Sequence, residues 1–218
     1  MEPENQNLLL EGAKGFGVYL DENTLAAFDL FLRDLLKWNQ KINLTAIRTE
    51  KGIIIKHFLD SLSVYPYLPK SASLLDIGSG AGFPGIPLKI VDPSFEITLI
   101  DSVHKKVDFQ RHIIRRLGLR RIEAVHGRVQ DGEIVRQMEG RFDHVLSRAF
   151  SDLQTFLLFS YPFLKKGGIA LAMKGELKGE EIQILKEGER VRYRLQKAVA
   201  VTLPFPSSKR TILLFEKR

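Results

Sequence analysis

The sequence has no cysteine, one tryptophan and three methionines among its 218 residues. Without cysteine, the chain cannot form disulfides, thiolate zinc sites, cysteine-ligated iron–sulfur clusters or a cysteine nucleophile. It also has no run of about 18 consecutive apolar residues, the length that a membrane-spanning helix needs. Its first four residues include two glutamates, and the leucines over 8–10 are too few for the apolar part of a signal peptide. We therefore expect a cytoplasmic protein without a membrane segment, and we predict no metal site.

The remaining composition is that of an ordinary globular protein, with 44% hydrophobic and 27% charged residues. A chain of this length buries roughly 70% of the surface that its unfolded form exposes, so its core needs no disulfide or metal. Lysine and arginine number 33 against 26 aspartates and glutamates, a formal net charge of +7. This balance favours a polyanionic partner, although a protein that is merely soluble and basic would show it too.

The first 70 residues are predicted to be helical. Apolar residues from Leu25 to Leu36 recur every three or four positions, which is typical of one buried helix face, and Asp21 or Asn23 can cap its start. A second helix is expected over 53–65, and the proline-containing segment 65–71 is typical of a connector.

After residue 71, short apolar runs alternate with longer amphipathic segments, which predicts an open, largely parallel α/β sheet. The last two runs are only seven residues apart, too few for a helical crossover, so we expect them to pair antiparallel at the sheet edge. We therefore expect a helical region over 1–70 and a sheet domain over 71–218. The predicted strands cover residues 73–77, 96–100, 122–126, 144–146, 168–173, 198–203 and 211–215.

The strongest motif is DIGSGAGFPG over residues 76–85, between a predicted strand and a predicted helix. Its glycines permit a sharp turn and a close ligand, and a helix start favours a carboxylate or phosphate. Residues 80–85 spell the G-x-G-x-x-G pattern of dinucleotide sites, whereas Gly78, Gly80 and Gly82 after Asp76 resemble the first motif of S-adenosylmethionine methyltransferases. Asp101, at the end of the next predicted strand, can accept hydrogen bonds from ribose hydroxyls with either cofactor.

The predicted strand arrangement favours the second cofactor. Five strands followed by an antiparallel pair resemble the Rossmann-like sheet of class I S-adenosylmethionine-dependent methyltransferases, which has seven strands and is mostly parallel with an antiparallel last strand. The nicotinamide-binding sheet lacks that final pair. This step is an analogy between folds, and we expect a class I methyltransferase fold with an N-terminal helical cap.

Six segments spread along the chain resemble a single family. They read WNQKINLT over 38–45, HFLDSL over 57–62, GSGAGFPGIP over 78–87, DS over 101–102, SRAF over 147–150 and MKG over 173–175. The glycine loop is common to many methyltransferases, but the ordered combination is not. From about residue 25 to its end, the chain closely resembles the bacterial ribosomal RNA small-subunit methyltransferase G family, also called glucose-inhibited division protein B.

This resemblance implies methyl transfer from S-adenosylmethionine to N7 of one guanine of 16S ribosomal RNA, guanine 527 in the 530 loop. The implied partner is 16S rRNA within the 30S subunit or an assembly intermediate, and we expect a monomer. Guanine N7 has a lone pair and no proton, so it can attack a sulfonium methyl without a general base; the enzyme must supply alignment and a dry site. Methylation of an exocyclic amine usually comes with an Asp/Asn-Pro-Pro-aromatic motif, where this chain has SRAF.

The resemblance also implies site residues. Gln130 stands where relatives often carry glutamate, and its amide oxygen can still accept from the adenine amino group, with Asp131 as a second acceptor. The residues expected to hold the cofactor are Asp76, Gly78, Gly80, Gly82, Phe83, Asp101, Val129, Gln130 and Arg148.

Four residues are expected to serve catalysis. Arg148 and Lys174 end successive predicted strands, at the edge where open α/β sheets bind ligands. The alternative for Arg148 is a structural ion pair, and the alternative for Lys174 is a solvated surface lysine. Asn39 and His57 lie outside the sheet domain, and the resemblance favours a role in closing the site rather than purely structural hydrogen bonding. Phe150 either stacks on the target base or packs in the core.

Seven cations and one acid lie between Ser102 and Arg121, on a predicted amphipathic helix. Such a cluster of cations is usually just the solvent-exposed face of a helix. Because the chain also resembles an RNA-modifying family, we interpret the cluster as a phosphate-binding surface. Further phosphate contacts, or plain surface charge, are expected in a loop between the last two strands. The predicted RNA contacts are Lys105, Lys106, Arg115, Arg116, Lys209 and Arg210.

Three other functions compete with this prediction. One is a methyltransferase of the same fold that acts on a small molecule or another RNA, and the basic helix argues against a small molecule. The others are an oxidoreductase with a nucleotide cofactor and an RNA-binding module without catalysis.

Overall fold

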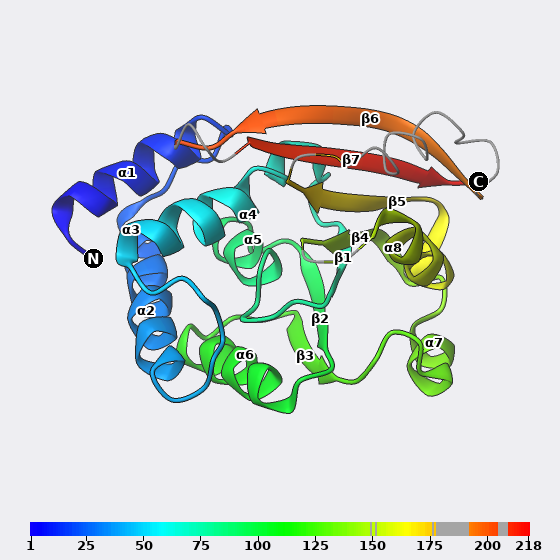
Figure 1. Cartoon of the computed structure of the whole chain (residues 1–218), viewed down its shortest axis with the longest axis horizontal. Helices are drawn as coiled ribbons and strands as arrows, with labels where there is room; N and C mark the ends of the chain where they lie inside the picture. Colours follow the sequence, from blue (N-terminus) through cyan, green and yellow to red (C-terminus); the bar gives the residue numbers. More distant parts are fainter. Residues whose placement is uncertain (149, 151, 176, 178–191, 205–208) are drawn as a thin grey trace.

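The computed structural model describes residues 1–148, 150, 152–175, 177, 192–204 and 209–218 (Figure 1). Its centre is a seven-stranded sheet in the order β3-β2-β1-β4-β5-β7-β6. All strand pairs from β3 to β5 are parallel, and β7 runs antiparallel to both of its neighbours. The predicted class I methyltransferase fold is thus confirmed. The strands are β1 (Ser73–Ile77), β2 (Glu96–Asp101), β3 (Ile122–His126), β4 (Phe142–Ser147), β5 (Leu164–Lys174), β6 (Tyr193–Thr202) and β7 (Lys209–Lys217).

Two predictions about the last strands were wrong. The β6 strand begins at Tyr193, five residues before the predicted start, because most of its side chains are exposed at the sheet edge and leave no apolar run. Lys209 and Arg210 open β7 and are not in a loop. Their polar side chains resemble those of a loop, although their backbones pair with Thr202 and Val201.

The N-terminal region is helical, as predicted, but its second helix differs from the expected one. It starts at Glu50, ends at Leu62, and contains the π-helical segment η1 (Ile54–Leu59) between α3 (Glu50–Ile53) and α4 (Asp60–Leu62). A π-turn is wider than an α-turn, so a search for 3.6-residue periodicity does not find it. Before it lie α1 (Pro3–Lys14) and α2 (Glu22–Asn39), which is capped by Asp21 and not by Asn23.

Helices cover both faces of the sheet (Figure 1). The N-terminal helices share one face with α5 (Gly85–Val91) and α6 (His104–Arg116), and α7 (Gly132–Met138) and α8 (Leu153–Ser160) pack on the other. Phe31 of α2 stacks on Phe83 of the glycine loop, with ring centres 5.2 Å apart, and lies 6.1 Å from Phe109 of α6. The helical region therefore packs directly against the loop expected to bind the cofactor.

The predicted boundary near residue 70 falls between the 3₁₀ turn Tyr65–Tyr67 and β1. Within the described ranges, no helix is both long enough and apolar enough to cross a membrane.

Candidate active site

The glycine loop lies between β1 and α5, at the carboxyl edge of the sheet. Gly78, Gly80 and Gly82 have φ values of 67°, 60° and 95°, in the left-handed region. A Cβ at Gly78 would meet no atom within 4 Å, so the space beside this residue is open to a ligand. A Cβ at Gly82 would come within 2.3 Å of Ile86, so this glycine is needed for the turn and the packing beneath it.

The loop is fixed by hydrogen bonds from two neighbouring elements. Gly80 N donates to Asp101 Oδ2 of β2 at 2.8 Å. From α6, Gln110 donates to Ser79 Oγ at 2.8 Å and to Gly80 O at 2.7 Å. Sequence reasoning missed Gln110, although an amide in register with the buried positions Val107 and Ile113 was a usable signal.

Asp76 lies fully buried under the loop. Its Oδ2 accepts from Gly85 N at 2.9 Å, whereas its Oδ1 has no hydrogen-bond partner among the residues that the structure places. Burial raises the pKa of Asp76 to about 7. A ligand that brings a cation, such as the ammonium group of S-adenosylmethionine, fits this unsatisfied carboxylate.

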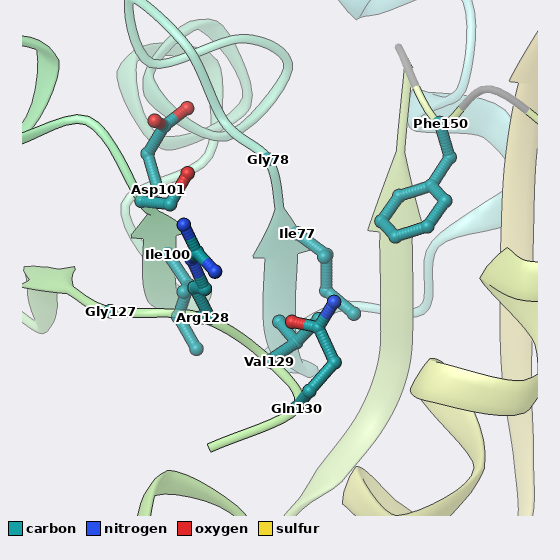
Figure 2. Close-up of a pocket in the computed structure, with 10 residues that line it drawn as sticks. Ile77, Gly78, Ile100, Asp101, Gly127, Arg128, Val129, Gln130 and Phe150 are labelled. Carbon is teal, nitrogen blue, oxygen red and sulfur yellow. The ribbon is translucent and has the colours of Figure 1, made fainter.

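A first cavity of about 300 Å³ lies beside the loop (Figure 2). Asp101 and Phe150 lie on opposite sides of it, with Ile77 between them. Apolar walls with a carboxylate and an amide at the rim suit a nucleoside. The cavity contains five residues predicted as cofactor contacts or as an aromatic partner, and it adds Arg128 and Ser102, which were not predicted. Its lining is Ile77, Gly78, Ile100, Asp101, Ser102, Gly127, Arg128, Val129, Gln130 and Phe150.

Asp131 does not line this cavity, although its neighbour Gln130 does. Its carboxylate accepts from Glu133 N at 2.9 Å and caps α7. Phe150 packs 6.0 Å from the rings of both Phe156 and Phe159, so core packing, the alternative to base stacking, accounts for its position.

Two more cavities adjoin the first. The second, of about 170 Å³, shares Gly78 with it; the third, of about 360 Å³, shares His57 and Arg148 with the second. The three cavities are therefore neighbours near the carboxyl edge of the sheet, with Gly78, His57 and Arg148 in their shared walls. The second is lined by Leu44, Thr45, His57, Gly78, Ser79, Gly80, Ala81, Phe83, Lys106 and Arg148, and the third by Ile47, Lys56, His57, Asp60, Arg148, Met173, Lys174, Gly175 and Arg210.

Arg148, directly after β4, joins the sheet to the π-helical segment. Its Nη1 donates to His57 Nδ1 at 2.9 Å and to Lys56 O at 3.1 Å. Its guanidinium carbon lies 5.0 Å from the centre of the Phe83 ring, and its Nη1 lies 3.8 Å from Asp60 Oδ2. Arg148 is thus both part of an ion pair and a wall of two cavities.

Asp60 was missed by the sequence analysis. It is buried, and its Oδ1 accepts from Arg210 Nε at 2.9 Å. Burial raises the pKa of Asp60, and the two arginines oppose that effect. Its signal was its place three residues after His57, one helical turn further along the HFLDSL segment.

His57 is held in one tautomer by its neighbours. His57 Nδ1 lies 2.9 Å from Arg148 Nη1 and 3.0 Å from Lys56 O, to which Arg148 Nη1 also donates. Because a proton on Nδ1 would face the Arg148 donor, we assign the ring proton to Nε2, which then donates to Thr45 Oγ1 at 2.8 Å. Burial and the charge of Arg148 lower the pKa of His57 to about 3. His57 is therefore neutral and has no basic nitrogen available to a substrate.

Asn39 lines none of these three cavities; it lines a separate one beside Leu36 and Asn43. Its Oδ1 accepts from Leu44 N and Thr45 N at 2.8 and 2.9 Å, and its Nδ2 donates to Thr45 O at 2.9 Å. Lys174, at the end of β5, lines the third cavity and donates to Phe150 O at 3.2 Å.

The predicted RNA contacts lie on two elements, α6 and the start of β7. Lys105 is exposed at the start of α6 and Lys106 lines the second cavity, but Arg115 lies about 15 Å further along the helix axis. Next to it, Arg116 pairs with Asp34 at 3.4 Å. At the opposite end of the site, Lys209 is exposed and Arg210 lines the third cavity.

No group of three or more histidines, aspartates or glutamates could hold a metal ion in the described part of the chain.

The unsatisfied carboxylate predicts pH-dependent binding of S-adenosylmethionine. With a pKa of about 7, Asp76 must lose a proton before it can pair with the ligand's ammonium group. The affinity should therefore fall by roughly tenfold between pH 7 and pH 5.5, by linkage. Calorimetric titrations across this range test it, and Asp76→Asn should bind more weakly with little pH dependence. A wild-type affinity that is flat over the same range would contradict the assignment.

Solved structures with a similar fold include a named methyltransferase and a protein in complex with AdoMet. An S-adenosylmethionine-dependent methyltransferase from Aquifex aeolicus superposes with a TM-score of 0.59 at 18% identity, over 77% of this chain and 93% of that one. The TYW2 protein of M. jannaschii in complex with AdoMet also gives 0.59, at 16% identity over 79% of this chain and 80% of that one. At these identities the likeness shows the fold alone.

Sequence relatives are closer. The Geobacter metallireducens protein named ribosomal RNA small subunit methyltransferase G is 40% identical over 219 residues, which cover 100% of this chain and 99% of that one. The Geobacter sulfurreducens protein of the same name is 41% identical over 94% of both chains. The family described as rRNA small subunit methyltransferase G matches residues 24–212. The chain therefore belongs to the ribosomal RNA small subunit methyltransferase G family.

Proposed function

We propose that this protein transfers the methyl group of S-adenosylmethionine to N7 of guanine 527 in the 530 loop of 16S rRNA. The observation that carries the proposal is the group of three adjoining cavities, joined at Gly78 and at Arg148. These neighbouring cavities offer a nucleoside site, a polar middle and a cationic end. The names of the sequence relatives support the RNA substrate.

The residues present fit the cofactor. Asp101, Val129 and Gln130 would hold the nucleoside in the first cavity, and Asp76 would balance the ammonium group. When bound, S-adenosylmethionine supplies a methyl group on a positively charged sulfur. Gln110 and Asp101 already fix the glycine loop by hydrogen bonds, so binding does not have to order the loop.

The third cavity suits a guanine. It is lined by the donors Lys56, Arg148, Lys174 and Arg210, whereas its carboxylate, Asp60, is already bonded to Arg210. Guanine presents O6, an acceptor, beside N7, whereas adenine presents an amino donor there. A cavity walled by donors therefore favours guanine. N7 carries no proton, which agrees with a His57 that has no basic nitrogen to offer.

The exposed cations of α6 support a large anionic substrate over a small one. Lys105 and Arg115 are exposed, and neither forms an ion pair with any residue that the structure describes. Such side chains bind phosphates and set affinity rather than base choice. A ribosomal substrate also implies a cytoplasmic enzyme, and we infer that the 30S subunit or its precursor is the natural acceptor.

We further infer a monomer. The large apolar side chains exposed in the described ranges are Tyr19, Val103 and Leu158, which lie on separate segments. They form no patch of the size that a stable dimer buries.

Arg148→Ala should strongly slow methylation while the chain stays folded. We expect kcat to fall by roughly 100-fold, because Arg148 fixes the junction between the two sides of the site and small misplacements are costly there. Labelled S-adenosylmethionine with 30S subunits that lack the modification measures this, and strand cleavage at N7-methylguanine maps the position. Arg194→Ala, which removes an exposed arginine paired with Glu216, is the matched control and should retain wild-type activity. Label at another base, or none despite cofactor binding, would refute the proposed substrate.

Arg115 and Arg116 provide a paired test of phosphate binding. Arg115→Ala should raise the KM for 30S subunits severalfold, leave kcat unchanged and lower the slope of log KM against log salt by about one. Arg116→Ala should have a smaller effect, because Asp34 already pairs with Arg116. Equal KM values for wild type and Arg115→Ala across salt concentrations would place RNA elsewhere.

A further inference from the structure

The backbone of Thr45 is fixed through both its N–H group and its carbonyl oxygen. Its N donates to Asn39 Oδ1 at 2.9 Å, and its carbonyl oxygen accepts from Asn39 Nδ2 at 2.9 Å. Asn39 is the last residue of α2, so the end of this helix determines where Thr45 lies. A loop residue held this firmly can position a side chain as accurately as a helix can.

The Thr45 hydroxyl already accepts two hydrogen bonds. With the His57 ring proton assigned to Nε2, they come from His57 Nε2 at 2.8 Å and from Ile47 N at 3.1 Å. A hydroxyl has two lone pairs and one proton, so both acceptor positions are filled and only the proton is left to donate. His57 does not receive it in the assigned tautomer, in which the ring proton lies on Nε2, away from the Arg148 donor. The Thr45 hydroxyl therefore acts as a donor toward the second cavity, which Thr45 lines.

A second donor in this cavity comes from the glycine loop. The N–H groups of Gly78, Ser79 and Gly80 donate to Ile100 O or Asp101 Oδ2, and those of Gly82 and Phe83 donate to Ser79 O. Ala81 lies between them and lines the cavity, yet its N–H has no acceptor among the described residues. A buried donor of this kind ordinarily has a partner, which a ligand can supply.

The cavity is also lined by two cations and by no carboxylate. Lys106, half-buried in the first turn of α6, lines it together with Arg148. A space of about 170 Å³ with two unused donors and flanking cations suits a small anionic group.

We propose that Thr45 donates its hydroxyl proton in a hydrogen bond to the carboxylate of the cofactor's amino-acid end, beside Ala81 N–H and Lys106. The proposal rests on the proposed function, because it takes S-adenosylmethionine as the ligand. Gly78 borders both the first and the second cavity, so a ligand with its nucleoside in the first extends its amino-acid end into the second. The N-terminal helical region thereby completes the cofactor site. Asn39 and His57 are positioning residues that act through Thr45.

Thr45→Val and Thr45→Ser separate the hydroxyl from the shape of the side chain. Thr45→Val should weaken S-adenosylmethionine binding about tenfold, which corresponds to about 1.4 kcal/mol, and Thr45→Ser should keep near wild-type affinity. Decarboxylated S-adenosylmethionine lacks only the carboxylate, so Thr45→Val should change its affinity by less than about twofold. Calorimetry with both ligands measures the difference, and Thr49→Val is the matched control because the Thr49 hydroxyl caps α3 outside the three cavities.

Two outcomes would overturn the proposal. The first is a Thr45→Val protein that binds both ligands as wild type does. The second is an equal loss of affinity for both ligands, as a purely structural role of Thr45 would require. If Thr45→Val does not fold, Lys106→Met tests the same carboxylate site without disturbing the bonds of Thr45, and it should also weaken only the ligand that has the carboxylate. A wild-type protein that binds neither ligand would refute the proposed function itself, whereas equal losses in the variants would refute only the role of Thr45.

Discussion

The site depends on one buried contact, between the Arg148 guanidinium after β4 and the π-helical segment that carries Lys56, His57 and Asp60. It joins residues 91 positions apart and places the N-terminal helices over the glycine loop. A buried arginine must have partners, because an isolated charge in the interior is very costly. The Lys56 carbonyl, the His57 ring, the Phe83 face and Asp60 supply them. Arg148 therefore determines the geometry of both the second and the third cavity.

The same contact determines the chemistry of the residues around it. Because Arg148 donates to His57 Nδ1, His57 donates from Nε2 to Thr45, and a chain of hydrogen bonds runs from the strand end to the loop after α2. Below pH 6.5 the unfolded chain protonates this histidine, but the folded chain does not until about pH 3. This difference lowers the free energy of unfolding as the pH falls. A neutral, fully bonded histidine suits a reaction whose nucleophile has no proton to remove.

Local sequence patterns predicted the sheet and the loop, but not the contacts between distant segments. The strands, Asp76, Asp101 and the glycines were predictable because each is marked by its immediate neighbours. Asp60 and Gln110 were missed, because their partners are chosen by packing between helices and sheet. The π-turn was missed because it breaks the helical period, and the start of β7 because exposed strand residues resemble a loop. Family resemblance named Asn39 and His57, but only the structure relates them to Thr45.

The most direct test of the Arg148 contact is the ionisation of His57, followed by ¹⁵N chemical shifts of its ring in the full-length protein. The account predicts a neutral ring protonated at Nε2 and unprotonated at Nδ1, with no titration between pH 5 and pH 8, since its pKa lies at about 3. Arg148→Ala should restore titration or release the tautomer. A wild-type His57 that titrates near pH 6.5, or that carries its proton on Nδ1, would contradict the account.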